Sequence, residues 1–351
     1  MLVFASSPMV RWGEMRTVLS VLIVVVAVQF AIPVPPQKKS YPSPSPYFNW
    51  THNFSLELAH LAFDHAAAAY SPTPKPCLEP YGSKLIKRVA IPCDRVWDEC
   101  WAFVSLSKEW IVVSFRGTVN RLQLTIEILD DVLFPKSSFE AGGAVVHYFS
   151  AAFSTVWPEL NATIADLKEV YPNRSLLFTG HSLGGALASL ASTQFAFDHK
   201  DSVNSSELLL VTFGQPRVGN MDYSVAHDRL VPNSWRIVHA KDLVAHIPSC
   251  YISLWSRKCS SYHNHATYHH GTEIWFPDDM SPGSMFRICT GRPTNEDSNC
   301  SDAYYYNMNI TEHIFYFDVH VSEYGINGCR NVSRTLSMRG NRTPKFKEDG
   351  F

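Results

Sequence analysis

The stretch TGHSLGGA, residues 179–186, contains the pattern G-x-S-x-G centred on Ser182. An apolar run precedes the pattern, and a helical pattern of small residues follows it. In this context the pattern predicts a sharp turn from strand to helix, which exposes a serine Oγ at a helix N-terminus. The elbow consists of Gly180, His181 and Gly184 around the serine, and it predicts that Ser182 is a nucleophile.

Apolar runs that alternate with helical patterns predict an α/β fold with a central, mostly parallel sheet flanked by helices. The runs are residues 110–115, 176–178, 208–213 and 235–240. Sheets of this kind gather their chemistry at the carboxyl ends of the strands. Three of these runs lead directly to a candidate residue, namely Thr118, Ser182 and Asp242.

A serine nucleophile needs a histidine to take its proton and a carboxylate to orient that histidine. Asp242 is the predicted acid because it follows an apolar strand, whereas the competing Asp222 and Asp228 lie in a polar stretch. The histidines that follow it are His246, His263, His265, His269, His270, His313 and His320. His313 stands beside an aromatic segment, and the pattern alone leaves open whether it is the base or a packed core residue.

An oxyanion hole needs two donors aimed at the developing negative charge. The backbone N–H of Leu183, which follows the nucleophile, is the first candidate. Thr118 in the segment Arg116-Gly117-Thr118 is the second, with its N–H and its hydroxyl, although the same segment could be an ordinary turn.

The histidines at 263–270 invite a metal interpretation, but their spacing lacks a helical H-x₃-H frame with a carboxylate partner. The cysteines show no C-x₂-C pair. The sequence therefore predicts no metal site.

The chain has 351 residues, 46% of them hydrophobic, and can bury a large core. Its formal net charge is −2, which gives no support to a nucleic-acid partner. Arg11 and Arg16 precede an apolar segment at 18–28 that has the length of a signal-peptide core, with cleavage expected near Ala31. A retained signal anchor is the alternative, although a membrane span needs about 20 apolar residues.

The expected layout is a signal peptide at 1–32, a Pro-rich linker at 33–54, a single folded domain at 55–330 and a polar tail at 331–351. The protein is expected to be secreted or to reside in the lumen of the secretory pathway.

An even number of cysteines behind a signal peptide predicts disulfides. Short separations favour Cys93–Cys100, Cys250–Cys259 and Cys289–Cys300, which leaves Cys77–Cys329 to join the ends. N-x-S/T acceptor sequences predict glycosylation at Asn49, Asn53, Asn161, Asn173, Asn204, Asn309, Asn331 and Asn341.

Several separated motifs together resemble a known family. They are FRGT at 115–118, GHSLGGA at 180–186, FGQPRVGN at 213–220, and the segment 241–248 that contains Asp242. From about Leu56 to Cys329 the chain resembles the class 3, fungal-type triacylglycerol lipases of the α/β-hydrolase fold.

The resemblance implies that the segment around His313 holds the catalytic histidine and that HHGTEIW at 269–275 is structural. It also implies a disulfide between Cys289 and Cys300, lipid ester substrates, transient contact with a lipid interface, and no cofactor. Such lipases cover the site with an amphipathic helix. Apolar residues at helical spacing favour a lid here, or an ordinary surface helix; they are Leu122, Ile126, Leu129 and Leu133.

These observations predict a secreted serine lipase that cleaves acylglycerol esters through an acyl-enzyme. A phospholipase A1 or another esterase on the same scaffold is the alternative within the same chemistry. A non-catalytic secreted lipid-binding protein is the alternative from another class. The exact lipid, the oligomeric state and protein partners are not encoded in these motifs.

Overall fold

The computed structural model describes residues 54–93, 99–118, 135–252, 259, 266–291, 295–304 and 308–330. The chain divides into two compact units, Met1–Tyr47 and Phe48–Phe351, and every described residue lies in the second. The predicted signal peptide, most of the linker, the predicted lid and the C-terminal tail lie outside the described residues.

An eight-stranded sheet forms the centre of the second unit, in the order β1-β2-β3-β6-β7-β8-β9-β10. Its strands are β1 Lys84–Pro92, β2 Glu99–Leu106, β3 Trp110–Phe115, β6 Ser175–His181, β7 Leu208–Phe213, β8 Asn233–His239, β9 Thr272–Phe276 and β10 Arg287–Ile288. The five strands from β3 to β9 in this order are parallel neighbours. The pairs β1–β2, β2–β3 and β9–β10 at the two edges are antiparallel.

Two short hairpins accompany the sheet: β4 Lys136–Ser138 pairs with β5 Ala144–Val146, and β11 Phe315–Tyr316 pairs with β12 Val319–His320. The α-helices are α2 Leu56–Ala68, α3 Lys75–Leu78, α5 His147–Val170, α6 Leu183–Asp198, α7 Met221–Leu230, α8 Ile310–Ile314 and α9 Val321–Ile326. Short 3₁₀ turns are η1 Glu79–Tyr81, η2 Ser205–Glu207, η3 Val244–His246 and η4 Ser301–Tyr304.

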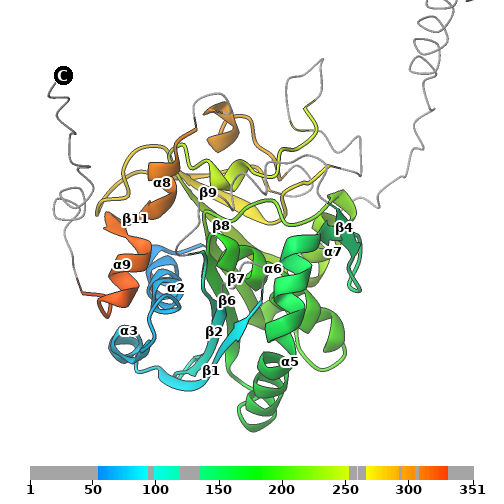
Figure 1. The fold of residues 1–351 in the computed structure, drawn as a ribbon, viewed down its shortest axis with the longest axis vertical. Coiled ribbons are helices and arrows are strands. Elements are labelled where there is room, and N and C mark those ends of the chain that lie inside the picture. The colour runs from blue at the N-terminus through cyan, green and yellow to red at the C-terminus, as the bar shows by residue number, and fades with distance from the viewer. Residues whose placement is uncertain are drawn as a thin grey trace, which may run out of the picture. The chain divides into compact units, whose positions relative to one another are not determined.

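The central strands are apolar on both faces because helices cover both faces. Leu176 and Phe178 of β6 pack in the cluster that α5 and α6 complete. Leu177, between them, points to the opposite face and packs with Ala62 and Phe63 of α2. Figure 1 shows α2 and α9 on one side of the sheet and α5 and α6 on the other. The doubly covered sheet predicted from the apolar runs is confirmed.

Within the described residues, no helix is both long enough and apolar enough to span a membrane.

Disulfides join the four cysteine pairs Cys77–Cys329, Cys93–Cys100, Cys250–Cys259 and Cys289–Cys300. Cys77–Cys329 spans 252 residues and ties α3 to the residues that follow α9, whereas Cys93–Cys100 spans 7 residues. Cross-links that close long loops remove more conformational entropy from the unfolded chain.

Replacing both members of one disulfide by serine should therefore cost more stability for Cys77–Cys329 than for Cys93–Cys100. The loop-entropy difference between 252 and 7 residues is about 3 kcal/mol. Chemical denaturation of the two double variants beside the wild type measures it. Equal free energies of unfolding in the two variants would contradict the expectation.

Candidate active site

Ser182 occupies the turn between β6 and α6 with a strained backbone, at φ 60° and ψ −131°. Such a conformation costs a non-glycine residue about 1–3 kcal/mol and is retained where the surroundings hold it. The Ser182 N–H donates to the Phe213 carbonyl of β7 at 2.9 Å. A side chain at Gly180 would collide with the Gly184 backbone, and one at Gly184 would collide with the Phe115 carbonyl. Close packing of strand and helix thus holds the turn in place.

Asp242 and His313 form a fully buried pair beside this turn. The His313 Nδ1 lies 3.0 Å from each carboxylate oxygen of Asp242. The Tyr316 hydroxyl donates to Oδ2 at 2.6 Å, and the Val244 N–H donates to Oδ1 at 2.8 Å. Burial by itself would raise the pKa of Asp242, but His313, by charge and hydrogen bond, and the Tyr316 hydroxyl lower it to about 2. Asp242 is therefore a carboxylate at neutral pH.

A carboxylate can only accept hydrogen bonds, so the Nδ1 of His313 carries the hydrogen and the Nε2 of a neutral ring is basic. That Nε2 is buried and has no hydrogen-bond partner in the described part of the chain. The elbow and the pair meet at Gly214, which directly follows Phe213. A Cβ at Gly214 would lie 2.5 Å from Asp242 Oδ2 and 2.7 Å from His313 Nδ1. The structure thus brings Ser182, Asp242 and His313 to one edge of the sheet.

The segment that ends β3 lies against the elbow. A Cβ built at Gly117 would lie 3.0 Å from the Ser182 Cβ. The Thr118 Oγ1 is buried and has no hydrogen-bond partner among the residues described. Leu183 is the first residue of α6, whose first N–H groups lack intrahelical acceptors and carry the positive end of the helix dipole. Of the two predicted oxyanion donors, Leu183 adjoins Ser182 in the chain, and Thr118 follows the glycine that lies against it.

Arg116 anchors this segment to the neighbouring strand β2. Its guanidinium lies 4.0 Å from the Trp101 ring centroid and donates to the Glu99 carbonyl. The Arg116 N–H also donates to the Trp101 carbonyl at 2.9 Å. Because Arg116 anchors this segment, the Thr118 donor would lose little entropy when negative charge develops near it. Such preorganised donors favour electrostatic stabilisation.

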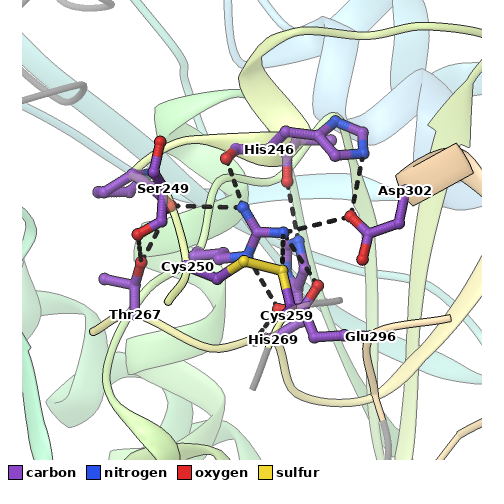
Figure 2. Close-up of a disulfide and its surroundings, with 11 residues drawn as sticks. His246, Ser249, Cys250, Cys259, Thr267, His269, Glu296 and Asp302 are labelled. Carbon is purple, nitrogen blue, oxygen red and sulfur yellow. Dashed lines mark hydrogen bonds and ion pairs between the residues drawn. A yellow bond between two sulfur atoms is a disulfide. The ribbon is translucent and has the colours of Figure 1, made fainter. Parts of the chain in front are cut away.

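The turn that carries Asp242 rests on a charge cluster, here called the Arg217 cluster. It consists of buried Arg217, Glu296 and His246 and of half-buried Asp302. Arg217 donates to both Glu296 oxygens, at 2.8 and 2.9 Å, and to the His246 carbonyl. The His246 Nδ1 donates to the Asp242 carbonyl at 2.8 Å. Figure 2 shows Glu296, Asp302 and His246 around the Cys250–Cys259 disulfide.

Removing one member of a buried ion pair leaves an uncompensated charge, which costs about 3–5 kcal/mol. Glu296 therefore fixes Arg217, and Arg217 in turn supports the turn after Asp242 through the His246 carbonyl. Burial and the neighbouring Glu296 raise the pKa of Asp302 to about 7, so Glu296 is the principal counter-charge.

The other candidate histidines and acids have structural partners. His269 donates to the Ala245 carbonyl, His270 lies 2.7 Å from the Ser189 hydroxyl, and His320 caps α9. Asp228 accepts from the Gly271 N–H and from Asn295, while Asp222 lies in the first turn of α7. His263 and His265 lie outside the described residues.

Three groups of possible metal ligands lie close together among the described residues. Two of them, Glu273–Cys289–Cys300 and Cys259–Glu296–Asp302, rely on sulfurs that are in disulfides and have no thiolate to offer. In the third, His227, Asp228 and His270, both nitrogens of His227 already face hydroxyls, of Thr193 and Ser234. We therefore assign no metal to these groups.

Three supporting residues escaped the sequence reasoning: Gly214, Arg217 and Tyr316. Tyr316 lies near His313 in the chain, but its bond to Asp242 joins residues 74 apart. Gly214 and Arg217 belong to the FGQPRVGN stretch, which was noted only as a family motif. Their position directly after β7, at the edge where Ser182 and Asp242 gather, was the signal that could have identified them.

Comparisons with known proteins identify a family. The family model described as Lipase (class 3) matches residues 112–252. A Caenorhabditis elegans lipase is 35% identical over 292 residues, which cover 77% of this chain and 81% of that protein. The Rhizomucor miehei lipase is 31% identical over 61% of this chain, an alignment that spans 53% of that enzyme's length.

Solved structures give the same fold. The structure of Rhizomucor miehei lipase with its propeptide matches at a TM-score of 0.62 and 25% identity, covering 82% of this chain and 93% of that one. Lipase II from Rhizopus niveus matches at a TM-score of 0.63 and 24% identity, covering 76% of this chain and 95% of that one.

Substituting Gly214→Ala should separate Asp242 from His313, because the new methyl would press on both and the residue has φ +55°. A displacement of this kind lowers kcat by about a hundredfold. Ester hydrolysis by the purified variant measures the loss.

Gly82→Ala is the matched control, since Gly82 has φ +60° and a Cβ there would meet nothing within 4 Å. It carries the same backbone strain without the collision and should keep wild-type kcat. Equal activity of the two variants would contradict the assigned contact.

Proposed function

This chain belongs to the class 3 lipase family and is a carboxylic ester hydrolase of the triacylglycerol lipase type, and we propose that Ser182, His313 and Asp242 cleave its acylglycerol esters. The observation that carries the proposal is the buried Asp242–His313 pair beside a strained serine at a helix N-terminus. The pair supports the role of an oriented base, and the turn supports the role of a nucleophile at the positive end of a helix.

In the proposed acylation step, the Ser182 oxygen attacks the ester carbonyl carbon while its proton passes to the Nε2 of His313. The Asp242 carboxylate keeps Nδ1 protonated and stabilises the imidazolium cation. The carbonyl oxygen becomes an oxyanion that accepts from the Leu183 N–H and from Thr118. The Leu183 N–H belongs to the first turn of α6, and Arg116 anchors the segment before Thr118, so little reorganisation is needed.

The tetrahedral intermediate then breaks its bond to the alcohol oxygen, and His313 returns its proton to that oxygen. The glycerol part of the substrate leaves as an alcohol, and the fatty acyl group stays on Ser182. Water then attacks the acyl carbon while its proton passes to the same Nε2. The bond to the Ser182 oxygen breaks, His313 returns the proton to that oxygen, and the fatty acid leaves. The cycle balances one water consumed against one acid and one alcohol formed.

The same machinery would serve a phospholipase A1 or another esterase, because the triad contacts only the ester group. The lid prediction bears on this choice and lies outside the described residues. A binding protein without turnover would not need a basic Nε2 held by an ionised carboxylate. We therefore place acylglycerol hydrolysis first.

Substituting Ser182→Ala should lower kcat by about a thousandfold or more, because the attacking oxygen is removed. Emulsified long-chain triacylglycerols, phospholipids and soluble short-chain esters form the substrate panel. Ser154→Ala, which removes an exposed hydroxyl on α5, is the matched control.

Activity that survives in Ser182→Ala would refute the nucleophile. Serine-dependent turnover confined to phospholipids or to short soluble esters would replace the triacylglycerol assignment. Lipid retention by the wild type, without turnover of any ester, would favour the binding-protein alternative.

We further propose that the protein is secreted. Four disulfides are typical of oxidising compartments. The acceptor asparagines Asn173, Asn204 and Asn309 are exposed, while Asn161 is half-buried on α5. Exposed acceptors suit the bulk and polarity of glycans.

Protein expressed in animal cells should appear in the medium, and peptide N-glycosidase should increase its electrophoretic mobility. Asn173→Gln should remove one glycan step, because that acceptor is exposed. Retention of unglycosylated chain inside the cells would contradict the secretion proposal.

A further inference from the structure

His181, the elbow residue before Ser182, makes contacts that a simple turn residue would not need. It ends β6 and is buried, with a relative exposure of 4%. Its Nε2 lies 2.8 Å from the main-chain carbonyl of His313, and its ring stacks on the His313 ring at 4.5 Å between centroids and an interplanar angle of 25°. Its Nδ1 lies 2.7 Å from the Tyr70 hydroxyl.

These partners determine where the hydrogens lie. A carbonyl can only accept, so the Nε2 of His181 carries the hydrogen and donates to His313. Burial first, and then the charge of His313, lower the pKa of His181 to about 3, so the ring is neutral at neutral pH. Its Nδ1 is therefore an acceptor, and the Tyr70 hydroxyl donates to it.

Tyr70 extends the connection to the predicted oxyanion segment. Its oxygen accepts from the Gly117 backbone N–H, and the side chain is buried. The donors therefore run in one direction: from Gly117 to Tyr70, from Tyr70 to His181, and from His181 to His313. This series of hydrogen bonds links Gly117, the residue before Thr118, to the backbone of His313.

The bond to the His313 carbonyl matters because α8 has only five residues. The last carbonyls of a helix have no intrahelical donors and need partners from elsewhere. His181 supplies one for His313, and the Nδ1 of His239 supplies one for Phe315 at 2.6 Å. Two imidazoles at the ends of β6 and β8 thus hold the segment that carries His313.

Charge matters as well. His313 becomes a cation when it takes the serine proton, and a second cation stacked on it would oppose that step. Asp242 is the only carboxylate that is bonded to the His313 ring in the described structure. Because His181 is neutral, the Asp242 carboxylate stabilises the His313 cation without an opposing charge from His181.

We propose that His181, set by Tyr70, is a positioning residue that fixes the main chain of His313 and keeps an uncharged ring against it. This inference rests on the proposed role of His313 as the base. Without the Nε2–H donor, the His313 backbone is free to shift and its Nδ1 loses its alignment with Asp242. Because the carboxylate stabilises the protonated ring, misalignment weakens that stabilisation.

The test compares Tyr70→Phe, His181→Asn and His181→Gln. A glutamine amide can reach the position of Nε2 and keep the N–H donor, whereas the shorter asparagine amide reaches only the position of Nδ1. We expect Tyr70→Phe and His181→Asn to lower kcat about tenfold with little change in KM. We also expect the acid limb of the kcat/KM profile to move to lower pH in both, and His181→Gln to restore both properties in large part.

Tyr223→Phe is the matched control, since it removes another buried tyrosine hydroxyl, one that contacts Ser189 and Thr193. It should leave the pH profile of the wild type unchanged. If His181→Asn fails to fold, Tyr70→Phe decides the matter, because it deletes one oxygen and keeps the ring.

A wild-type kcat and acid limb in Tyr70→Phe and His181→Asn would overturn the proposal. So would equal losses in His181→Asn and His181→Gln without a shift of the acid limb. Failure of the proposed function gives a different result, because Ser182→Ala would then keep its activity. The two outcomes are therefore distinguishable in one set of assays.

Discussion

A fully buried, ionised carboxylate is the constraint on which the rest of this structure depends. Asp242 has no exposed surface, and a charge in such a place is tolerated only with complete compensation. His313, Tyr316 and the Val244 N–H supply hydrogen bonds to it. The end of β8, the turn after it and the segment from α8 to β11 must therefore meet at one point, and Ser182 lies beside that point.

The Arg217 cluster supports the turn that carries Asp242 in the same way, by pairing buried charges. The turn that carries Asp242 has little regular structure of its own, so its shape comes from what it rests on. Arg217 binds the His246 carbonyl, and His246 binds the Asp242 carbonyl. Glu296 balances the guanidinium charge and reaches it from a segment near the Cys289–Cys300 disulfide. A loop becomes a rigid support because its charges are buried and paired.

Much of the scaffold could be predicted from the sequence, because its signals are local. The run 208–213 coincides with β7, and the helical pattern of small residues after the elbow lies in α6. The elbow was readable since a serine between glycines, after a strand, has few other uses. His313 was harder: residue pattern alone left it open, and the family resemblance selected it. Its bond to Asp242 joins residues 71 positions apart, which no local pattern contains.

The sequence by itself determined the α/β class, the elbow at Ser182 and the strand-end position of Asp242, because hydrophobic period and glycine placement act over a few residues. The tertiary structure alone decided which nitrogen of His313 is bonded to Asp242, that Tyr70 and Gly117 connect to His181, and that Arg217 supports the acid turn. These depend on burial and on hydrogen bonds between distant segments. Such properties arise only when the strands align and exclude water, since charge state and tautomer follow from the surroundings of a group.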